Sequence, residues 1–248
     1  MAGHSAWKNV KHKKAANDKK RGKVWSKCSR AIIVAARNGG GDPKFNTTLR
    51  YAIDDAKAAN MPKETIEKAI KKGTGETEGL GYESIRYEGY APGGVALIID
   101  CLTDNPTRTA AEMRTMFEKQ GGNLAKPGAV AFSFSSKGVI LIESGKVSED
   151  RLMEIVLDAG AEDVSESEAG WQVTTEPASF LKVKDALEGV GIEPASAEVT
   201  MLPQMTVECD EALAARVMKL IEVLEDHDDV QKVFHNADIA EDVMAKLG

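Results

Sequence analysis

The hydrophobic periodicity of the chain changes at one glycine-dense stretch, GTGETEGLG, residues 73–81. Before this stretch, apolar residues recur at the three- and four-residue spacing of amphipathic helices. After it, short apolar runs typical of strands alternate with helical patterns. The order predicts an α+β protein, in which an N-terminal three-helix domain is followed by two ferredoxin-like α/β sandwich domains, one inserted in the other.

Three helices are expected before the glycine-dense stretch. The helix over residues 18–38 has one apolar face, made of Val24, Trp25, Cys28, Ala31, Ile32, Ala35 and Ala36. Glycines 39–41 can end it, because glycine adopts the left-handed conformation that closes a helix. A second helix is expected over 46–60 with Asn46 as its N-cap, and a third over 62–73, where proline suits the first turn.

Charge is divided between the same two parts of the chain. Residues 1–72 carry 18 Lys and Arg against 6 Asp and Glu, a net charge of +12, and the rest carries 14 against 33, a net charge of −19. On the first helix, the side opposite the apolar face carries Lys20, Lys23, Lys27, Arg30 and Arg37. An outward row of cations on a compact helical unit suits a polyanion such as nucleic acid. A basic face that is merely solvated is the simpler alternative.

The segment ahead of the first helix, residues 1–17, is rich in Lys and lacks a helical stripe. We expect a flexible arm whose cations neutralise phosphates, while Trp7 either stacks on a base or packs in the core. His4 and His12 have no neighbouring thiol or carboxylate and indicate no metal site. The nucleic-acid-binding residues predicted on these grounds are Lys8, Lys11, His12, Lys13, Lys14, Lys19, Lys20, Arg21, Lys23, Lys27, Arg30 and Arg37.

The acidic remainder is predicted to form two mixed domains. Residues 137–203 alternate strand, helix, strand, helix and strand, a ferredoxin-like order. The strand, helix and strand of 205–235 are too few to close a core, so we expect them to pair with those of 94–135, which end in a strand AVAFSF at 129–134. The predicted domains are 1–73, then 74–136 together with 204–248, and an inserted domain over 137–203.

No catalytic or cofactor-binding motif is complete in the sequence. Cys28, Cys101 and Cys209 form no CxxC pair, which suits a reducing compartment. The glycines of 73–81 lack the lysine and hydroxyl residue of a phosphate-binding loop, and the acidic run 222–229 lacks the spacing of a calcium loop. We therefore expect a protein that is not an enzyme and uses no cofactor or metal. Without an apolar leader or a long apolar run, we expect it in the cytoplasm and away from membranes.

The helix that starts at Asn105 and Pro106 carries the one arrangement that resembles a catalytic site. Asp104, Arg108 and Glu112 combine carboxylates with an arginine clamp. The simpler interpretation is that Asp104 belongs to the turn that enters the helix. Arg108 and Glu112 are then an i, i+4 ion pair, worth a few tenths of a kcal/mol.

Three stretches carry a resemblance to a known family: MAGHSAWKNVKHKKAANDKKRGKVWSK, LTDNPTRTAAEMRTMFEKQGGNL and DDVQKVFHNADI. They resemble the YebC family of bacterial transcriptional regulators, which is related to the mitochondrial translational activator of cytochrome c oxidase. The resemblance spans nearly the whole chain. It implies three domains, one helical and two mixed, that bind nucleic acid and catalyse no reaction. Ala6 stands where the family pattern leads us to expect Lys, and Cys28 and Ser29 stand in a stretch that is usually more aliphatic.

Two functions remain open at this stage. In the first, the protein is a DNA-binding transcriptional regulator whose basic domain grips duplex phosphates, while the acidic domains meet a protein partner or a second copy. In the second, it is a ribosome-associated translation factor whose cations contact ribosomal RNA. The sequence offers no clear recognition helix, and phosphate contacts position a protein without specifying a base sequence.

Overall fold

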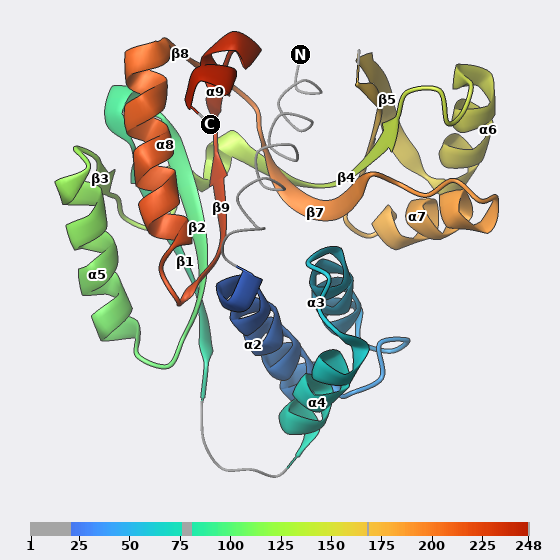
Figure 1. Cartoon of the computed structure of the whole chain (residues 1–248), viewed down its shortest axis with the longest axis horizontal. Coiled ribbons are helices and arrows are strands. Elements are labelled where there is room, and N and C mark those ends of the chain that lie inside the picture. The colour runs from blue at the N-terminus through green and yellow to red at the C-terminus, as the bar shows by residue number, and fades with distance from the viewer. Residues whose placement is uncertain (1–20, 76–80, 168, 248) are drawn as a thin grey trace. The chain divides into compact units, whose positions relative to one another are not determined.

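A computed structural model describes residues 21–75, 81–167 and 169–247 of the chain (Figure 1). One compact unit includes residues 133–206, and the other includes 15–132 and 207–248. Helices dominate the beginning and sheets follow, with one mixed unit inserted in the other, which confirms the predicted fold class. The finer domain boundaries at 73, 136 and 203 stay a prediction.

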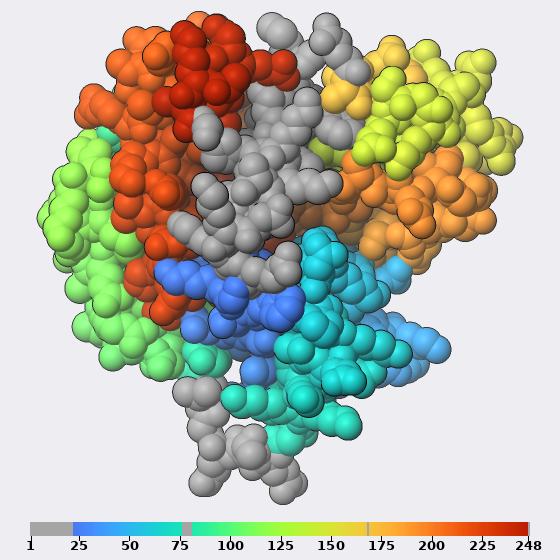
Figure 2. All heavy atoms as spheres, in the orientation of Figure 1, coloured from blue at the N-terminus to red at the C-terminus, as the bar shows by residue number. Residues whose placement is uncertain are grey.

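The first three described helices are α2 (Arg21–Gly39), α3 (Thr47–Ala58) and α4 (Lys63–Thr74). Figure 2 shows their atoms as one continuous surface, from blue at α2 to teal at α4. Their shared core is lined by buried aliphatic residues, among them Ile32, Ala36, Leu49, Ala56, Ile66 and Ala69. The predicted cap is confirmed, because the Asn46 side chain accepts a hydrogen bond from the Leu49 amide at 3.0 Å.

The larger mixed unit contains a four-stranded antiparallel sheet in the order β3-β1-β2-β9. Its strands are β1 (Glu83–Tyr90), β2 (Ala96–Thr103), β3 (Asn123–Leu124) and β9 (Val230–His235). Helices α5 (Pro106–Lys119) and α8 (Glu211–Glu225) pack on the sheet through a core that includes Leu97, Ile99, Met113, Phe117, Val217 and Leu220. The pairing of β2 with β9 joins segments on either side of the insertion, with Leu97 opposite His235.

Smaller elements complete this unit. A parallel pair is formed by β8 (Val207–Cys209) and β10 (Ala237–Ile239), and α9 (Glu241–Leu247) follows. The 3-10 turns are η1 (Pro92–Gly94) and η2 (Ala131–Ser133). At the start of α5, Asn105 accepts a hydrogen bond from the Arg108 amide and Pro106 occupies the first turn, as predicted.

The expected strand over 129–134 is wrong, because a buried side chain binds the amides of this segment. Glu88 on β1 is 4 % exposed. Its carboxylate accepts hydrogen bonds from the amides of Gly128 (2.7 Å), Val130 (2.7 Å) and Ala131 (2.9 Å). These amides therefore do not pair with a strand. Burial alone would raise the pKa of Glu88, but the three hydrogen bonds outweigh it and hold this pKa below its ordinary value.

Replacing Glu88 by Gln is expected to lower the free energy of unfolding by about 2 kcal/mol at neutral pH, because three buried amides lose a charged acceptor. Since the folded-state pKa is depressed, this contribution is present above the ordinary Glu pKa of about 4.3 and is lost as the pH falls below it. Urea unfolding of both proteins at pH 7 and in acid measures the difference. Glu83→Gln, at an exposed site on the same strand, is the matched control, and an equal loss for both variants would contradict the assignment.

The inserted unit has the ferredoxin-like sheet order β5-β6-β4-β7. Its elements are β4 (Phe134–Glu143), α6 (Glu149–Ala159), β5 (Ala161–Ser167), β6 (Gly170–Thr175), α7 (Phe180–Gly189) and β7 (Ser196–Pro203). Gly138 leaves room for the Phe180 ring, which would lie 2.6 Å from an added Cβ. Strand β5 was not expected, because its sequence AEDVSES is acidic and polar. It forms an edge of the sheet, where polar residues are tolerated.

Candidate functional site

The predicted nucleic-acid-binding residues fall into two groups in the structure. Lys8, Lys11, His12, Lys13, Lys14, Lys19 and Lys20 lie outside the described residues. Arg21 begins α2, and its side chain is likewise outside the description. The four remaining residues, Lys23, Lys27, Arg30 and Arg37, can be placed.

Two lysines of α2 contact the C-terminal end of α8. The Lys23 ammonium donates to the Asp226 carbonyl at 2.7 Å and lies 3.4 Å from the carboxylate of the same residue. The Lys27 ammonium donates to the Glu225 carbonyl at 2.5 Å. The last carbonyls of a helix have no partner within it and form the negative end of the helix dipole. Burial lowers the pKa of Lys27, although nearby Glu225 opposes this shift.

Arg30 on α2 extends these contacts to the start of β9. Its Nη1 donates to the Asp228 carbonyl at 2.8 Å, to the Leu102 carbonyl at 3.2 Å and to Asp229 Oδ1 at 3.1 Å. Its guanidinium carbon also lies 4.9 Å from the centre of the Tyr82 ring, a cation–π distance.

Lys27 and Arg30 are therefore partly buried against this turn and do not extend an open outward row, whereas Lys23 also contacts the turn but keeps an exposed side chain. The role of all three in binding nucleic acid stays a prediction. Helical spacing places them opposite the three-helix core, but it carries no information about a second element that covers that side. Here the α8–β9 turn supplies carbonyls and carboxylates that bind the three cations. Arg37, at the end of α2, has an exposed side chain.

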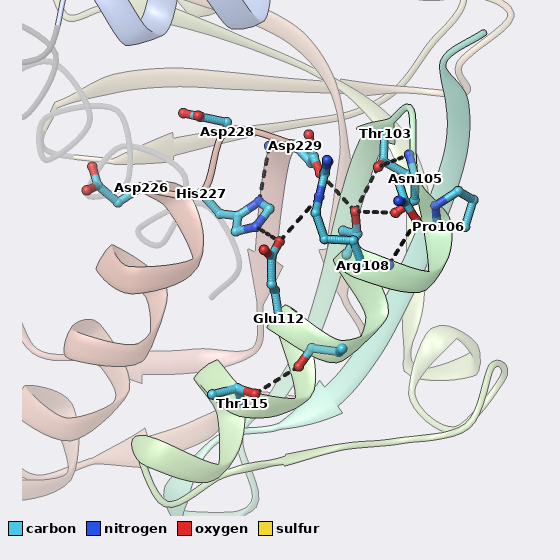
Figure 3. Close-up of polar contacts among 12 residues, drawn as sticks. Thr103, Asn105, Pro106, Arg108, Glu112, Thr115, Asp226, His227, Asp228 and Asp229 are labelled. Atoms are coloured by element: carbon cyan, nitrogen blue, oxygen red, sulfur yellow. Dashed lines mark hydrogen bonds and ion pairs between the residues drawn. The ribbon is translucent and has the colours of Figure 1, made fainter.

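Asp229 is the centre of a polar cluster at this turn (Figure 3). It is 4 % exposed. Its Oδ1 accepts the hydrogen bond from Arg30. Its Oδ2 accepts hydrogen bonds from Arg108 Nη2 at 2.7 Å and from Thr109 Oγ1 at 2.8 Å. Thr103 and Thr109 share a 2.7 Å hydrogen bond between their hydroxyls. Burial alone would raise the pKa of Asp229, but the bonds from Arg108 and Thr109 outweigh it and lower that pKa.

Glu112, His227 and Asp229 lie close enough to share a metal ion. Their ligand atoms already bind other groups, however. The amide of Asp229 donates to His227 Nδ1 at 3.1 Å, so the ring proton lies on Nε2, which donates to Glu112 Oε2 at 2.8 Å. Both oxygens of Asp229 bind arginines, which supply the positive charge that a metal would bring. The geometry is that of an ion-pair cluster.

The sequence-based interpretation of this helix is correct but incomplete. Asp104 and Glu112 lie 3.0 Å and 3.7 Å from the Arg108 guanidinium as i, i+4 partners. The shorter contact of Arg108 is to Asp229, 121 residues away, which local spacing could not reveal.

Cations that sequence analysis did not select lie exposed on α4 and around α3. They are Lys44, Lys57, Lys63, Lys68, Lys71 and Lys72. On α4, the run IEKAIKK places Ile66, Ala69 and Ile70 toward the helical core, so the same periodicity that revealed α2 could have identified the lysines between them. Over the described residues 21–75, 12 Lys and Arg oppose 5 Asp and Glu, a net charge of +7.

Replacing Lys27 and Arg30 together by Ala is expected to lower the free energy of unfolding by about 2 kcal/mol, because helix-end carbonyls and the Asp229 carboxylate lose donors. Thermal unfolding followed by circular dichroism measures the loss. Replacing Lys68 and Lys71 together by Ala, at exposed positions on α4, is the control and should change stability little. A double variant as stable as the control would show that these contacts do not hold α2 in place.

The thiols of half-buried Cys28 and buried Cys101 are unsuited to nucleophilic chemistry. Burial raises the pKa of Cys28 to about 11 and that of Cys101 to about 12. Both are protonated at neutral pH, whereas the thiolate is the nucleophile. Among the described helices, none combines the length and apolar character needed to cross a membrane.

Comparison with known proteins gives matches over the whole chain. Residues 5–76 match the family model "TACO1/YebC protein N-terminal domain", and residues 82–237 match "TACO1/YebC second and third domain". A "probable transcriptional regulatory protein" of Persephonella marina is 53% identical over 249 residues, with 100% of each chain covered. One of the same description from Methylococcus capsulatus is 54% identical, again over 100% of each chain.

A solved structure is also similar to this chain. The crystal structure of a conserved hypothetical protein from Aquifex aeolicus superposes with a TM-score of 0.78 at 48% sequence identity. The alignment covers 91% of this chain and 93% of that one.

Proposed function

The chain belongs to the TACO1/YebC family, and we propose on that premise that it is a DNA-binding transcriptional regulator that grips the phosphate backbone through its basic N-terminal helices. The names of its relatives support the regulatory role. DNA is the polyanion that a regulator of transcription meets.

The observation that carries the proposal is the charge of the three-helix region. Its described residues have a net charge of +7 in a chain whose net charge is −7. Since Lys23, Lys27 and Arg30 bind the α8–β9 turn, we assign phosphate contact mainly to the exposed lysines of α4 and to Arg37. The predicted residues from Lys8 to Lys20 keep their proposed role as an arm that adds cations to this surface.

A specific observation favours ribosomal RNA as the alternative target. The exposed cations of α4 are all lysines: Lys63, Lys68, Lys71 and Lys72. Lysine acts as a point charge toward phosphate, whereas arginine makes the bidentate contact to guanine that is common in DNA readout. A surface of lysines suits an RNA whose phosphate backbone is recognised by its shape. The relation of the family to a mitochondrial translational activator agrees with a role in translation. In this alternative the protein is a ribosome-associated translation factor.

One experiment separates these functions. The protein is crosslinked to nucleic acid in growing cells, the bound fragments are sequenced, and a parallel lysate is fractionated on a sucrose gradient. Enrichment of promoter DNA, with the protein away from ribosomes, supports the transcriptional function. Crosslinks to ribosomal RNA and comigration with ribosomes support the alternative. If neither promoter DNA nor ribosomal RNA is recovered, both proposed functions are contradicted.

The acidic units have a separate proposed role. The chain after residue 72 has a net charge of −19 and disfavours contact with phosphates. We propose that these units present surfaces to a protein partner or to a second copy of the chain.

A further inference from the structure

Phe45 is an aromatic residue displayed to solvent by the turn between α2 and α3. Its side chain is 87 % exposed. A phenylalanine gains roughly 1.5–3 kcal/mol when it is fully buried, so such exposure forgoes stability that folding could have provided.

The turn that carries Phe45 is held by specific hydrogen bonds. The Phe45 amide donates to the Asp42 carbonyl at 3.1 Å, and the Lys44 amide donates to Asp42 Oδ1 at 2.9 Å. Gly40 has a φ of +85°, which favours glycine. The geometry fixes the backbone on the N-terminal side of the ring.

The residue that follows Phe45 fixes the other side. Asn46 is 6 % exposed. Its side-chain Nδ2 donates to the carbonyls of Ala35 and Gly40, each at 2.8 Å, while its side-chain Oδ1 caps α3. The ring is therefore attached to a backbone that is tied to both helices, and a ligand would meet a site that is already formed.

Exposed basic and polar residues lie close to Phe45 along the chain. Lys44 is adjacent and exposed, and Arg37 is exposed at the end of α2. Thr47 and Thr48 add exposed hydroxyl groups in the first turn of α3. Phe132 is also exposed, at 74 %, but residues 128–136 contain no charged side chain.

We propose that Phe45 stacks on an unpaired base of a single-stranded nucleic acid whose phosphates are bound by Lys44 and Arg37. The inference rests on the proposed function and adds a site for single strands to the duplex contact proposed for the α4 lysines. Aromatic rings next to cations are the usual means by which proteins hold single strands, because every base has a face on which a ring can stack. In a duplex, these faces are covered by neighbouring base pairs.

The test uses the full-length protein and a fluorescein-labelled single-stranded RNA of mixed sequence, alone or annealed to its complement. Affinities are measured by fluorescence anisotropy at one fixed salt concentration. Phe45→Ala is expected to weaken single-strand binding by about 5- to 150-fold, the value of one stacked base. Its affinity for the duplex should stay at the wild-type value, and Phe45→Tyr should bind the single strand like wild type because a ring is retained.

Phe132→Ala is the matched control, since it removes an exposed ring from an uncharged segment. Single-strand affinity lost in Phe45→Ala but retained in Phe132→Ala supports the stacking site. Wild-type affinity in Phe45→Ala, or equal losses in both variants, overturns it and leaves the proposed function standing. If the wild-type protein binds neither form of the RNA nor duplex DNA, the proposed function itself has failed.

Discussion

Asp229→Ala is expected to lower the free energy of unfolding by about 3 kcal/mol, because the substitution leaves two arginine side chains without the buried carboxylate that they share. For a chain of this size, this corresponds to a fall in the unfolding temperature of about 6–12 °C. Calorimetry or thermal unfolding followed by circular dichroism measures the effect. Asp228→Ala is the matched control, since that carboxylate is 76% exposed and lies 4.0 Å from Lys23. Equal stability of the two variants would contradict the role of Asp229.

The difference in stability between wild type and Asp229→Ala is expected to depend on pH. The pKa of Asp229 is depressed in the folded state. Its contribution is therefore present above the ordinary Asp pKa of about 3.9 and is lost as the pH falls below it. The difference in stability between wild type and Asp229→Ala should shrink in acid. Arg30→Ala should also cost less in the Asp229→Ala background than alone, because the partner is already missing.

Replacing Lys68, Lys71 and Lys72 together by Gln is expected to weaken binding to duplex DNA by about two orders of magnitude. If wild type neutralises about six phosphates, the logarithm of its affinity falls against the logarithm of salt concentration with a slope near −5. Removing three contacts should reduce this slope to about −2.5. Filter binding across a salt series measures both quantities. The fold should persist, because these side chains are exposed.

A charge-matched control separates local contact from net charge. Lys119, Lys126 and Lys219 are exposed on the acidic mixed unit, and their joint replacement by Gln changes the net charge by the same amount. This variant should bind DNA nearly as well as wild type. If it loses as much affinity as the α4 variant, the total charge drives binding and α4 is not the contact surface.

Helix ends were predictable because their chemistry is local. Asn46 and Asn105 are N-caps, and the side-chain oxygen of each accepts a hydrogen bond from an amide only three residues along the chain. The buried faces of α2 and α8 follow from the helical period for the same reason. The resemblance to the family rests on stretches of contiguous sequence and extends to the whole chain.

Local patterns failed where a distant group changed the outcome. The segment 129–134 has the composition of a strand, but Glu88, some 40 residues earlier, binds its amides. Strand β5 has a polar sequence and pairs because β6 offers an edge. The exposure of Phe45 was not predicted from the sequence, since burial of an aromatic residue is the ordinary expectation.

The sequence by itself determined the order of helical and mixed parts, the division of charge between them and the family, because periodicity, composition and contiguous motifs are properties of neighbouring residues. Only the tertiary structure decided which cations remain available. Lys27 and Arg30 lie on the basic side of α2, yet the α8–β9 turn, about 200 residues away in the chain, uses them to bind helix-end carbonyls and Asp229. The physical reason is that a charge binds the oppositely charged or polar group that folding brings within hydrogen-bond distance, and sequence spacing does not encode that distance.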